Sequence, residues 1–416
     1  MAVTRLAAVD AQNFWMSAKI PNDQFLLYGF SGVPGDVRDA LSAVRQRALD
    51  CPELSVRIDE SDALRYPAWA HCSPADEAFV VHQAEAWAEC LALVQALSDR
   101  QLDPRERPWR VHVFAGVSGI PGANRPGTVV MVQISHALGD GIRSSALAAR
   151  LLGRDVAVPA VVPRRLGGWA LPYLALRASR AHRQLVRDTE SGVVAAPGDS
   201  FPLQPTNARP DAPHRLRTIV RRRSQLPGPS VTVGVLAAVS GALAVELDGP
   251  TVLGAEVPMA KTGVRHANNH FGNVSVGLHP NVPFVERAGR IAAELAARRQ
   301  RFEHPATAAS DAAFAATPAP LLRWGTAQFD PSVRSTTVGG NTVVSSVNRG
   351  PADLRFGDCA VVVTSGFPAL SPMMGLTHGV HGIGDTVTIS VHAAASAVPD
   401  LDRYVARLTA ELDNPH

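Results

Sequence analysis

The residues best suited to chemistry stand in one short motif, in which His136 is followed by Asp140 and Gly141. The near-neutral pKa of a histidine lets its ring take a proton at pH 7 and return it later. Asp140 is suited to a structural role, because a buried carboxylate paired with an arginine would hold the loop and its imidazole in one shape. Gly141 is expected to supply the backbone freedom that a tight passage from strand to helix needs.

The motif lies between a predicted strand and a predicted helix. Residues 128–134 are rich in β-branched side chains, which favours a strand, and residues 142–152 carry a helical apolar face that ends at Gly153. A histidine at a strand end is held by a rigid element while its ring faces a cleft. The pattern alone also fits an ordinary packed histidine before an Asp-Gly turn, but its position between two elements favours the catalytic interpretation.

The elements predicted along the chain alternate between strands and helices in both halves, which indicates an α/β (α+β) fold class. With 416 residues the chain is too long for one average domain. We expect an N-terminal lobe over residues 1–153, a crossover linker rich in Pro, Arg and Gly over 154–215, and a C-terminal lobe over 216–416. Residues 305–320, rich in Ala, Thr and Pro, are expected to be weakly packed.

Composition excludes several classes of protein. A net charge of +3 is too small for a dedicated nucleic-acid binder. The cysteines form no CxxC pair and the N-terminus lacks a secretory pattern, so we expect a reducing cytoplasm. The apolar stretch 156–176 is interrupted by arginines and glycines, which argues against a membrane-spanning helix. The pairs His266/His270 and His378/His381 have no third ligand at a convincing spacing, so no metal site is predicted.

The motif and several shorter stretches resemble the HxxxDG acyltransferase superfamily, and most of all its bacterial wax ester synthase/diacylglycerol acyltransferases. The likeness spans nearly the whole chain, although only the motif at His136 is specific by itself. The shorter stretches support the resemblance because they occur in the same order as in that family. In chain order they are Arg5-Leu6 and Asp10-Ala11, Leu102-Asp103 and Arg107-Pro108-Trp109, Pro205-Thr206-Asn207, Val235-Leu236-Ala237-Ala238 and Gly241-Ala242-Leu243, Val257-Pro258 and Gly272-Asn273-Val274, and Ser346-Val347-Asn348 and Gly350-Pro351.

The resemblance implies two chloramphenicol-acetyltransferase-like lobes that form a pseudo-dimer, with a tunnel at their interface reaching the motif from both faces. It also implies that an acyl group passes from coenzyme A to a hydroxyl, in lipid or natural-product metabolism, without a covalent acyl-enzyme. His136 matches the family's catalytic histidine, acting as general base, and Asp140 its structural aspartate. Arg57 resembles the arginine that pairs with that aspartate in related enzymes.

Two departures from the family pattern bear on the substrates. Ser135 stands where the family commonly has a first histidine, and Thr232 and Val233 stand where an Asn-Asp pair is often found. The missing Asn-Asp pair puts the substrate class in doubt more than the type of reaction. Besides backbone amides near Gly141, the candidate residues for binding substrate or the reaction's oxyanion are Ser135, Asn273, Ser346 and Asn348.

The partners that the resemblance implies are acyl-CoA or an acyl-carrier protein as donor and an alcohol as acceptor, with no permanently bound cofactor. We expect a monomer whose arginine-rich segment 177–187 either contacts a lipid surface or packs across the lobes. One alternative is a stand-alone condensation-type enzyme that takes its acyl group from a carrier-protein thioester and acylates an amine or alcohol. Another is a non-catalytic docking domain of the same fold, which would not require His136 or Asp140.

Overall fold

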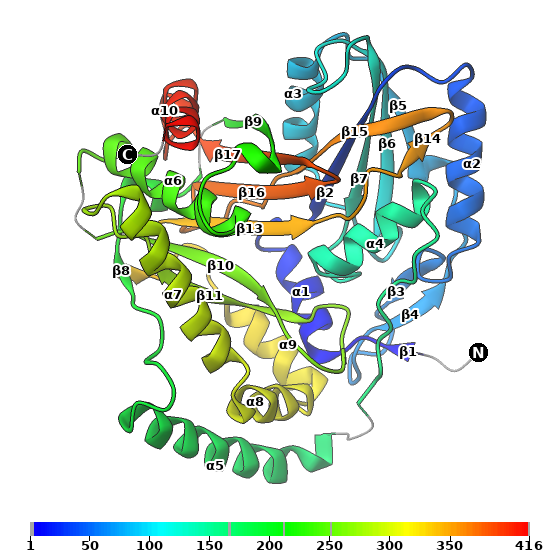
Figure 1. The fold of residues 1–416 in the computed structure, drawn as a ribbon. Coiled ribbons are helices and arrows are strands. Elements are labelled where there is room, and N and C mark those ends of the chain that lie inside the picture. The colour runs from blue at the N-terminus through cyan, green and yellow to red at the C-terminus, as the bar shows by residue number, and fades with distance from the viewer. Residues whose placement is uncertain (1–3, 165–167, 211–212, 250–251, 415–416) are drawn as a thin grey trace.

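Two lobes, each built on a six-stranded mixed sheet, make up the chain (Figure 1). The computed structural model describes residues 4–164, 168–210, 213–249 and 252–414. The predicted mixed α/β architecture with two lobes is confirmed. A smaller three-stranded sheet lies beside the first lobe, formed by β1 (Thr4–Arg5), β4 (Ala68–His71) and β3 (Val56–Asp59).

The sheet of the first lobe is covered by helices on both faces. Its strand order is β14 (Arg355–Phe356), β15 (Cys359–Gly366), β2 (Gln24–Phe30), β7 (Gly127–Ile134), β6 (Trp109–Val117) and β5 (Phe79–His82). Alternate side chains of a strand point to opposite faces, so β2 sends Leu26 and Tyr28 into one apolar core and Phe25 and Leu27 into another. The first core is closed by α2 (Val37–Leu49) and α4 (Gly141–Leu151), and the second by α3 (Trp87–Ser98).

The second lobe has one main core on one face of its sheet. Its strand order is β11 (Phe271–Gly277), β10 (Gly254–Ala260), β13 (Thr342–Asn348), β16 (Leu376–Ile383), β17 (Thr386–Ala394) and β9 (His214–Arg222). Helix α6 (Val231–Glu246) is apolar on nearly every side and is buried through most of its length. It packs against the sheet with one helix on either side, α7 (Phe284–Phe302) and α10 (Leu401–Asp413), and both of these also contact the sheet.

The second half of the chain contributes two strands to the sheet of the first lobe. After β13 the backbone leaves the second sheet, adds β14 and β15 to the edge of the first, and then returns as β16. Strand β15 pairs antiparallel with β2, with Thr364 opposite Tyr28. The predicted boundaries at residues 153 and 215 stay predictions. They did not include this contribution, which ties the second half of the chain to the first lobe by backbone hydrogen bonds.

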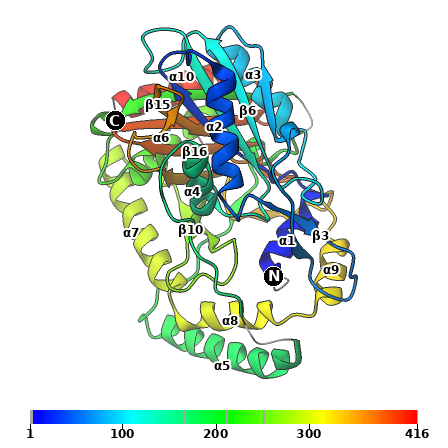
Figure 2. The ribbon, with the colours of Figure 1, turned by 90° about the vertical axis from the view of Figure 1, so that its right-hand side faces the viewer.

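Residues 305–320 are not the weakly packed stretch that their composition predicts. They form α8 (Pro305–Ala315) and lead into α9 (Ala319–Gln328). The helix α5 (Leu171–Glu190) lies along α8 at one end of the molecule, as both views show (Figures 1 and 2). Small alanines let the two helices approach closely. Leu174 and Leu185 of α5 are buried in that contact.

Candidate active site

His136 lies at the junction of the lobes. It follows β7 by two residues and is held in the turn that precedes α4. Its half-buried ring packs against Phe271 at the start of β11 in the second lobe, with ring centroids 5.6 Å apart. The prediction of a histidine between a strand and a helix, where the two halves meet, agrees with this position.

A hydrogen bond from the second lobe fixes the tautomer of this ring. Nδ1 of His136 is 2.7 Å from Oδ1 of Asn269, and Nδ2 of the same amide donates to the carbonyl oxygen of His136 at 2.7 Å. Because Nδ2 must be the donor in that second bond, Oδ1 must accept, and Nδ1 therefore carries the proton. The neutral ring is left with its lone pair on Nε2, which is the state that a general base requires.

Asp10 of α1 (Ala8–Ser17) holds Asn269 in place. Its Oδ1 accepts from the backbone N–H and the Nδ2 of Asn269, both at 2.9 Å, and its Oδ2 accepts from the backbone N–H of Asn268 at 2.8 Å. Burial raises the pKa of Asp10 to about 6, and these hydrogen bonds oppose the rise because they favour the charged form. A chain of polar contacts thus runs from α1 through Asn269 to the imidazole.

Asp140 joins the catalytic turn to the same segment of the second lobe. Its Oδ1 accepts from the backbone N–H of Arg143 at 3.0 Å and so caps α4. Its Oδ2 accepts from Nη1 of Arg265 at 2.7 Å and from the backbone N–H of His270 at 2.8 Å. The side chains of Asp140 and Arg265 are both nearly inaccessible to solvent. This geometry is suited to the structural role that we predicted for Asp140.

The prediction that Arg57 pairs with Asp140 is wrong. Arg57 lies on β3, where its backbone pairs with Ala70 in the small sheet beside the first lobe. The guanidinium beside Asp140 belongs to Arg265, which reaches it from the second lobe. Spacing along the first half of the chain could not reveal a partner that only the packing of the lobes supplies.

Gly141 matters for its size more than for its backbone. Its φ is not in the left-handed region, in contrast to Gly153 at the end of α4, where φ is 90°. A Cβ at Gly141 would lie 3.1 Å from Cγ2 of Val347 on β13, so glycine allows the start of α4 to approach the second sheet closely. Ser135 is buried, and its Oγ accepts from the backbone N–H of Ala137 at 3.4 Å, which places it within the turn.

The remaining substrate candidates are Ser346, Asn348 and Asn273 of the second lobe. Ser346 and Asn348 line a separate cavity of about 510 Å³ beside the start of α6, where Oγ of Ser346 accepts from Oγ1 of Thr232 at 3.0 Å. Strand alternation puts both on the face opposite Val347, which is the residue that meets Gly141. Asn273 is exposed on β11 near Glu256. Their predicted roles stay predictions, and the side-chain hydrogen bonds described for Ser346 and Asn273 go to Thr232 and Glu256, not to His136.

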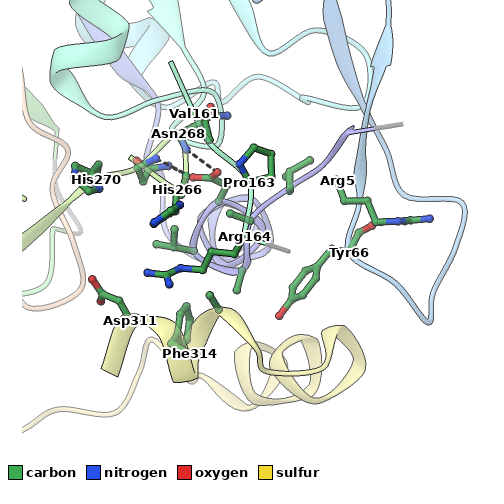
Figure 3. Close-up of a pocket in the computed structure, with 18 of the residues that line it drawn as sticks. Arg5, Tyr66, Val161, Pro163, Arg164, His266, Asn268, His270, Asp311 and Phe314 are labelled. Atoms are coloured by element: carbon green, nitrogen blue, oxygen red, sulfur yellow. Dashed lines mark hydrogen bonds between the residues drawn. The ribbon is translucent and has the colours of Figure 1, made fainter. Parts of the chain in front are cut away.

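A cavity of about 1490 Å³ opens between the lobes beside Asn269 (Figure 3). His266, Asn268 and His270 lie on one side of it, and Asp311 and Phe314 of α8 lie on another. Its cationic lining residues come from both lobes and the linker and include Arg5, Arg65, Arg143, Arg164 and Lys261. The cavity is large enough for a bulky amphipathic substrate. A continuous tunnel from both faces stays a prediction.

Burial lowers the pKa of His136 below its usual value, and the hydrogen bond to Asn269 opposes that change. The ring is therefore neutral at pH 7 and able to accept a proton. Within the described ranges, no group of three or more His, Cys, Asp or Glu side chains is placed to hold a metal ion. His378, one of the histidines weighed above, instead contacts Thr342 through Nδ1 and Tyr404 through Nε2.

Comparison with known proteins bears on the segment that supplies Asn269. Residues 267–414 match the WS/DGAT C-terminal domain. The predicted resemblance to wax ester synthase/diacylglycerol acyltransferases is confirmed. The matched WS/DGAT segment begins two residues before Asn269 and includes the strands β14 and β15. No match to a curated protein sequence is found.

Solved structures share the fold over nearly the whole chain. A wax ester synthase/diacylglycerol acyltransferase from Marinobacter aquaeolei VT8 superposes with a TM-score of 0.64 at 19% identity, covering 98% of each chain. The first condensation domain of the CDA synthetase gives 0.61 at 14% identity, covering 100% of this chain and 97% of the other. The starter condensation domain of rhizomide synthetase, solved with C8-CoA and Leu-SNAC, gives 0.59 at 14%, covering 99% and 96%. These likenesses establish the two-lobed WS/DGAT and condensation-domain fold.

Sequence reasoning missed Asn269 and Arg265 and gave Asp10 no role beyond the family likeness. Asp10 belongs to one of the stretches that resemble the family, and His270 was weighed only as a metal ligand. A run of three polar residues, Asn268-Asn269-His270, directly before β11 was the available signal. Nothing local shows that this run meets a turn more than 120 residues earlier.

Replacing Asn269 with alanine is expected to lower kcat/KM by about 10²-fold, because the ring would lose the contact that sets its orientation and tautomer. The pH–rate profile supplies a readout that general destabilisation would not move. The hydrogen bond to Asn269 raises the pKa of His136, so its loss should lower that pKa and shift the acid limb to lower pH. Asn414→Ala removes an exposed amide at the end of α10 and serves as the matched control. An unchanged acid limb in Asn269→Ala would count against this positioning role.

Proposed function

We propose that the protein is an acyltransferase that moves an acyl group from acyl-CoA to a hydroxyl acceptor, with His136 as general base. The observation that carries the proposal is the imidazole at the lobe junction, whose Nδ1–H is engaged by Asn269 and whose Nε2 is left as an acceptor. The WS/DGAT segment and the shared fold support acyl transfer in general. The solved condensation domain in complex with C8-CoA supports a coenzyme A thioester as donor.

The proposed reaction needs no covalent intermediate on the enzyme. Nε2 of His136 takes the proton of the acceptor hydroxyl as its oxygen attacks the thioester carbonyl carbon, which forms a tetrahedral oxyanion. The intermediate collapses, the C–S bond breaks, and the thiolate leaves with the proton that Nε2 carries. Holding two substrates together between the lobes supplies part of the rate. Backbone amides near Gly141 are the proposed donors to the oxyanion.

The cavity beside Asn269 is the proposed substrate site. Its cationic side chains suit the phosphates of coenzyme A, and Arg164 and Lys261 contribute from the linker and the second lobe. The test is to incubate the purified protein with octanoyl-CoA and a panel of alcohols, measuring thiol release and ester by mass spectrometry. Ester formation supports the proposal. Acyl transfer only from a loaded carrier protein, or only to an amine, would favour the condensation-type alternative, and no transfer from any donor would favour the docking domain.

Activity is expected to fall as the pH decreases through the pKa of His136, because only the neutral ring accepts a proton. Since burial lowers that pKa, the midpoint of the acid limb should lie below 6.5, and the rate should stay level from pH 7 to 8. The measurement is kcat/KM between pH 5 and 8. Burial also raises the pKa of Asp10 to about 6, so Asp10→Asn is measured in parallel to separate its contribution. A midpoint above pH 7 would contradict the base assignment.

Contact with a lipid surface is a further part of the proposal. No helix among the described residues is long and apolar enough to span a membrane. Trp169, directly before α5, is 80% exposed, and Tyr173 one helical turn later is 65% exposed, with the arginines of α5 following. Exposed aromatic rings beside basic side chains are typical of helices that lie on anionic lipid.

The lipid contact is tested by flotation with anionic phosphatidylglycerol vesicles. Binding should fall several-fold in a Trp169→Ser/Tyr173→Ser double variant, because both rings would lose their place in the lipid interface. Val285→Ser removes an equally exposed apolar side chain from α7 and is the matched control. Equal flotation of the wild type, the double variant and Val285→Ser would indicate that α5 only packs against α8.

A further inference from the structure

A second cavity lies between the lobes and shares no lining residue with the cavity beside Asn269. Its volume is about 300 Å³, at the lower end of the range for small-molecule sites. The first lobe contributes lining residues between Lys19 and Phe25 and between Val94 and Gln101. The second half contributes Arg209, Pro210, His214 and Leu216, and further residues between Phe367 and Pro372. The walls are largely apolar, with buried Phe25, Leu216, Phe367 and Leu370 among them. A ligand here would bury a compact apolar body.

Asp23 brings a carboxylate into this lining, and neither of the lining's two cations, Lys19 and Arg209, forms an ion pair with it. The residue is 3% exposed. Its Oδ2 accepts from the backbone N–H of Leu102 at 2.8 Å and from Nε2 of Gln133 at 2.7 Å, both neutral donors. Among the described residues, no Arg, Lys or His nitrogen lies within 4.0 Å of Asp23. A buried carboxylate is ordinarily paired with a cation. A cation bound in the cavity would balance the negative charge of Asp23.

His392 adds a second acceptor to the same cavity. Its Nδ1 donates to the carbonyl oxygen of Pro368 at 3.0 Å, so the neutral ring has its lone pair on Nε2. That nitrogen is buried and has no hydrogen-bond partner in the part of the chain that the structure describes. Burial lowers the pKa of His392 to about 4, which keeps the ring neutral at pH 7. The lining therefore offers a carboxylate and a neutral acceptor, and both call for donors.

We propose that this cavity binds a small primary amine as its ammonium ion, with the charged head between Asp23 and His392 and a compact apolar body against the walls. An ammonium group supplies both the positive charge and several N–H donors. A carboxylate ligand would be repelled by Asp23, and an alcohol would supply one donor and no charge. The site is independent of the proposed acyl transfer, because its lining includes neither His136 nor Asn269.

The test is isothermal titration calorimetry of the full chain with hexylamine, 1-hexanol and hexanoate. Hexylamine should bind most tightly, and Asp23→Asn should weaken it by about 10-fold or more, the effect of losing a hydrogen bond to a charged group. The asparagine keeps an oxygen for Leu102 and Gln133, so the fold should be preserved. Asp103→Asn, at an exposed acid outside the cavity lining, is the matched control and should bind as the wild type does.

Two further arms separate this site from the candidate active site. Hexylamine binding should persist in His136→Ala and in the presence of saturating octanoyl-CoA, whether or not the protein transfers acyl groups. Loss of binding in either arm would place the amine at the active site and overturn the proposal. Tighter binding of hexanoate, equal binding by Asp23→Asn, or no hexylamine binding at millimolar concentration would overturn it as well.

Discussion

Replacing His136 by alanine is expected to lower kcat/KM for ester formation by about 10²- to 10⁴-fold, the usual contribution of a positioned general base. Substrate affinity should change much less, because the ring is proposed to act on the proton of the attacking hydroxyl. The measurement is thiol release from octanoyl-CoA in the presence of the best alcohol, with circular dichroism to confirm the fold.

The control for this substitution is His266→Ala. His266 lines the large cavity, but its ring contacts the carbonyl oxygen of Val162 and not the catalytic turn. That variant should lose far less activity than His136→Ala, because its ring does not contact the catalytic turn. If His136→Ala retained full turnover while still folded, proton transfer by this imidazole would have no part in the reaction. The cavity would then be a binding site served by other groups.

Removing the carboxylate of Asp140 is expected to cost about 3–5 kcal/mol of stability, because Asp140→Ala leaves the Arg265 guanidinium buried and unpaired. The loss of the cap on α4 adds about 1 kcal/mol. Activity should fall too, since the turn that carries His136 loses its link to the second lobe. Urea denaturation followed by circular dichroism measures the free energy of unfolding.

Asp36→Ala is the matched control for the cap. Asp36 caps α2 through the backbone N–H groups of Arg38 and Asp39 but is exposed and holds no buried arginine. Its loss should cost only the capping contribution, about 1 kcal/mol. Arg265→Ala should resemble Asp140→Ala, whereas Arg57→Ala should not. Equal unfolding free energies for Asp140→Ala and Asp36→Ala would refute the ion-pair role.

The catalytic turn was predictable because its signals are local. A β-branched run, a histidine and an Asp-Gly pair before a helical pattern specify a strand, a turn and a helix start within about 25 residues. Asp140 caps α4 through the backbone N–H of Arg143, three residues away. Short-range geometry of this kind depends on residue types and spacing, and both can be read in the sequence.

The partners of that turn were not predictable because they come from far along the chain. Asn269, Arg265 and the strand β15 reach the first lobe only through the packing of one half on the other. A hydrogen bond between residues 133 positions apart leaves no periodic trace in either segment. The incorrect choice of Arg57 has the same origin, since many arginines are available and spacing cannot select among them.

The sequence by itself determined a two-lobed α/β chain with an imidazole at a strand end and a structural aspartate just before the helix that follows. Only the tertiary structure decided which nitrogen of His136 is free, because the neighbour of Nδ1 belongs to the other lobe. It also decided that α1 supplies Asp10 to support Asn269. The physical reason is that periodicity encodes which face of an element is buried, whereas the partners of a buried polar group depend on how separate elements meet in space.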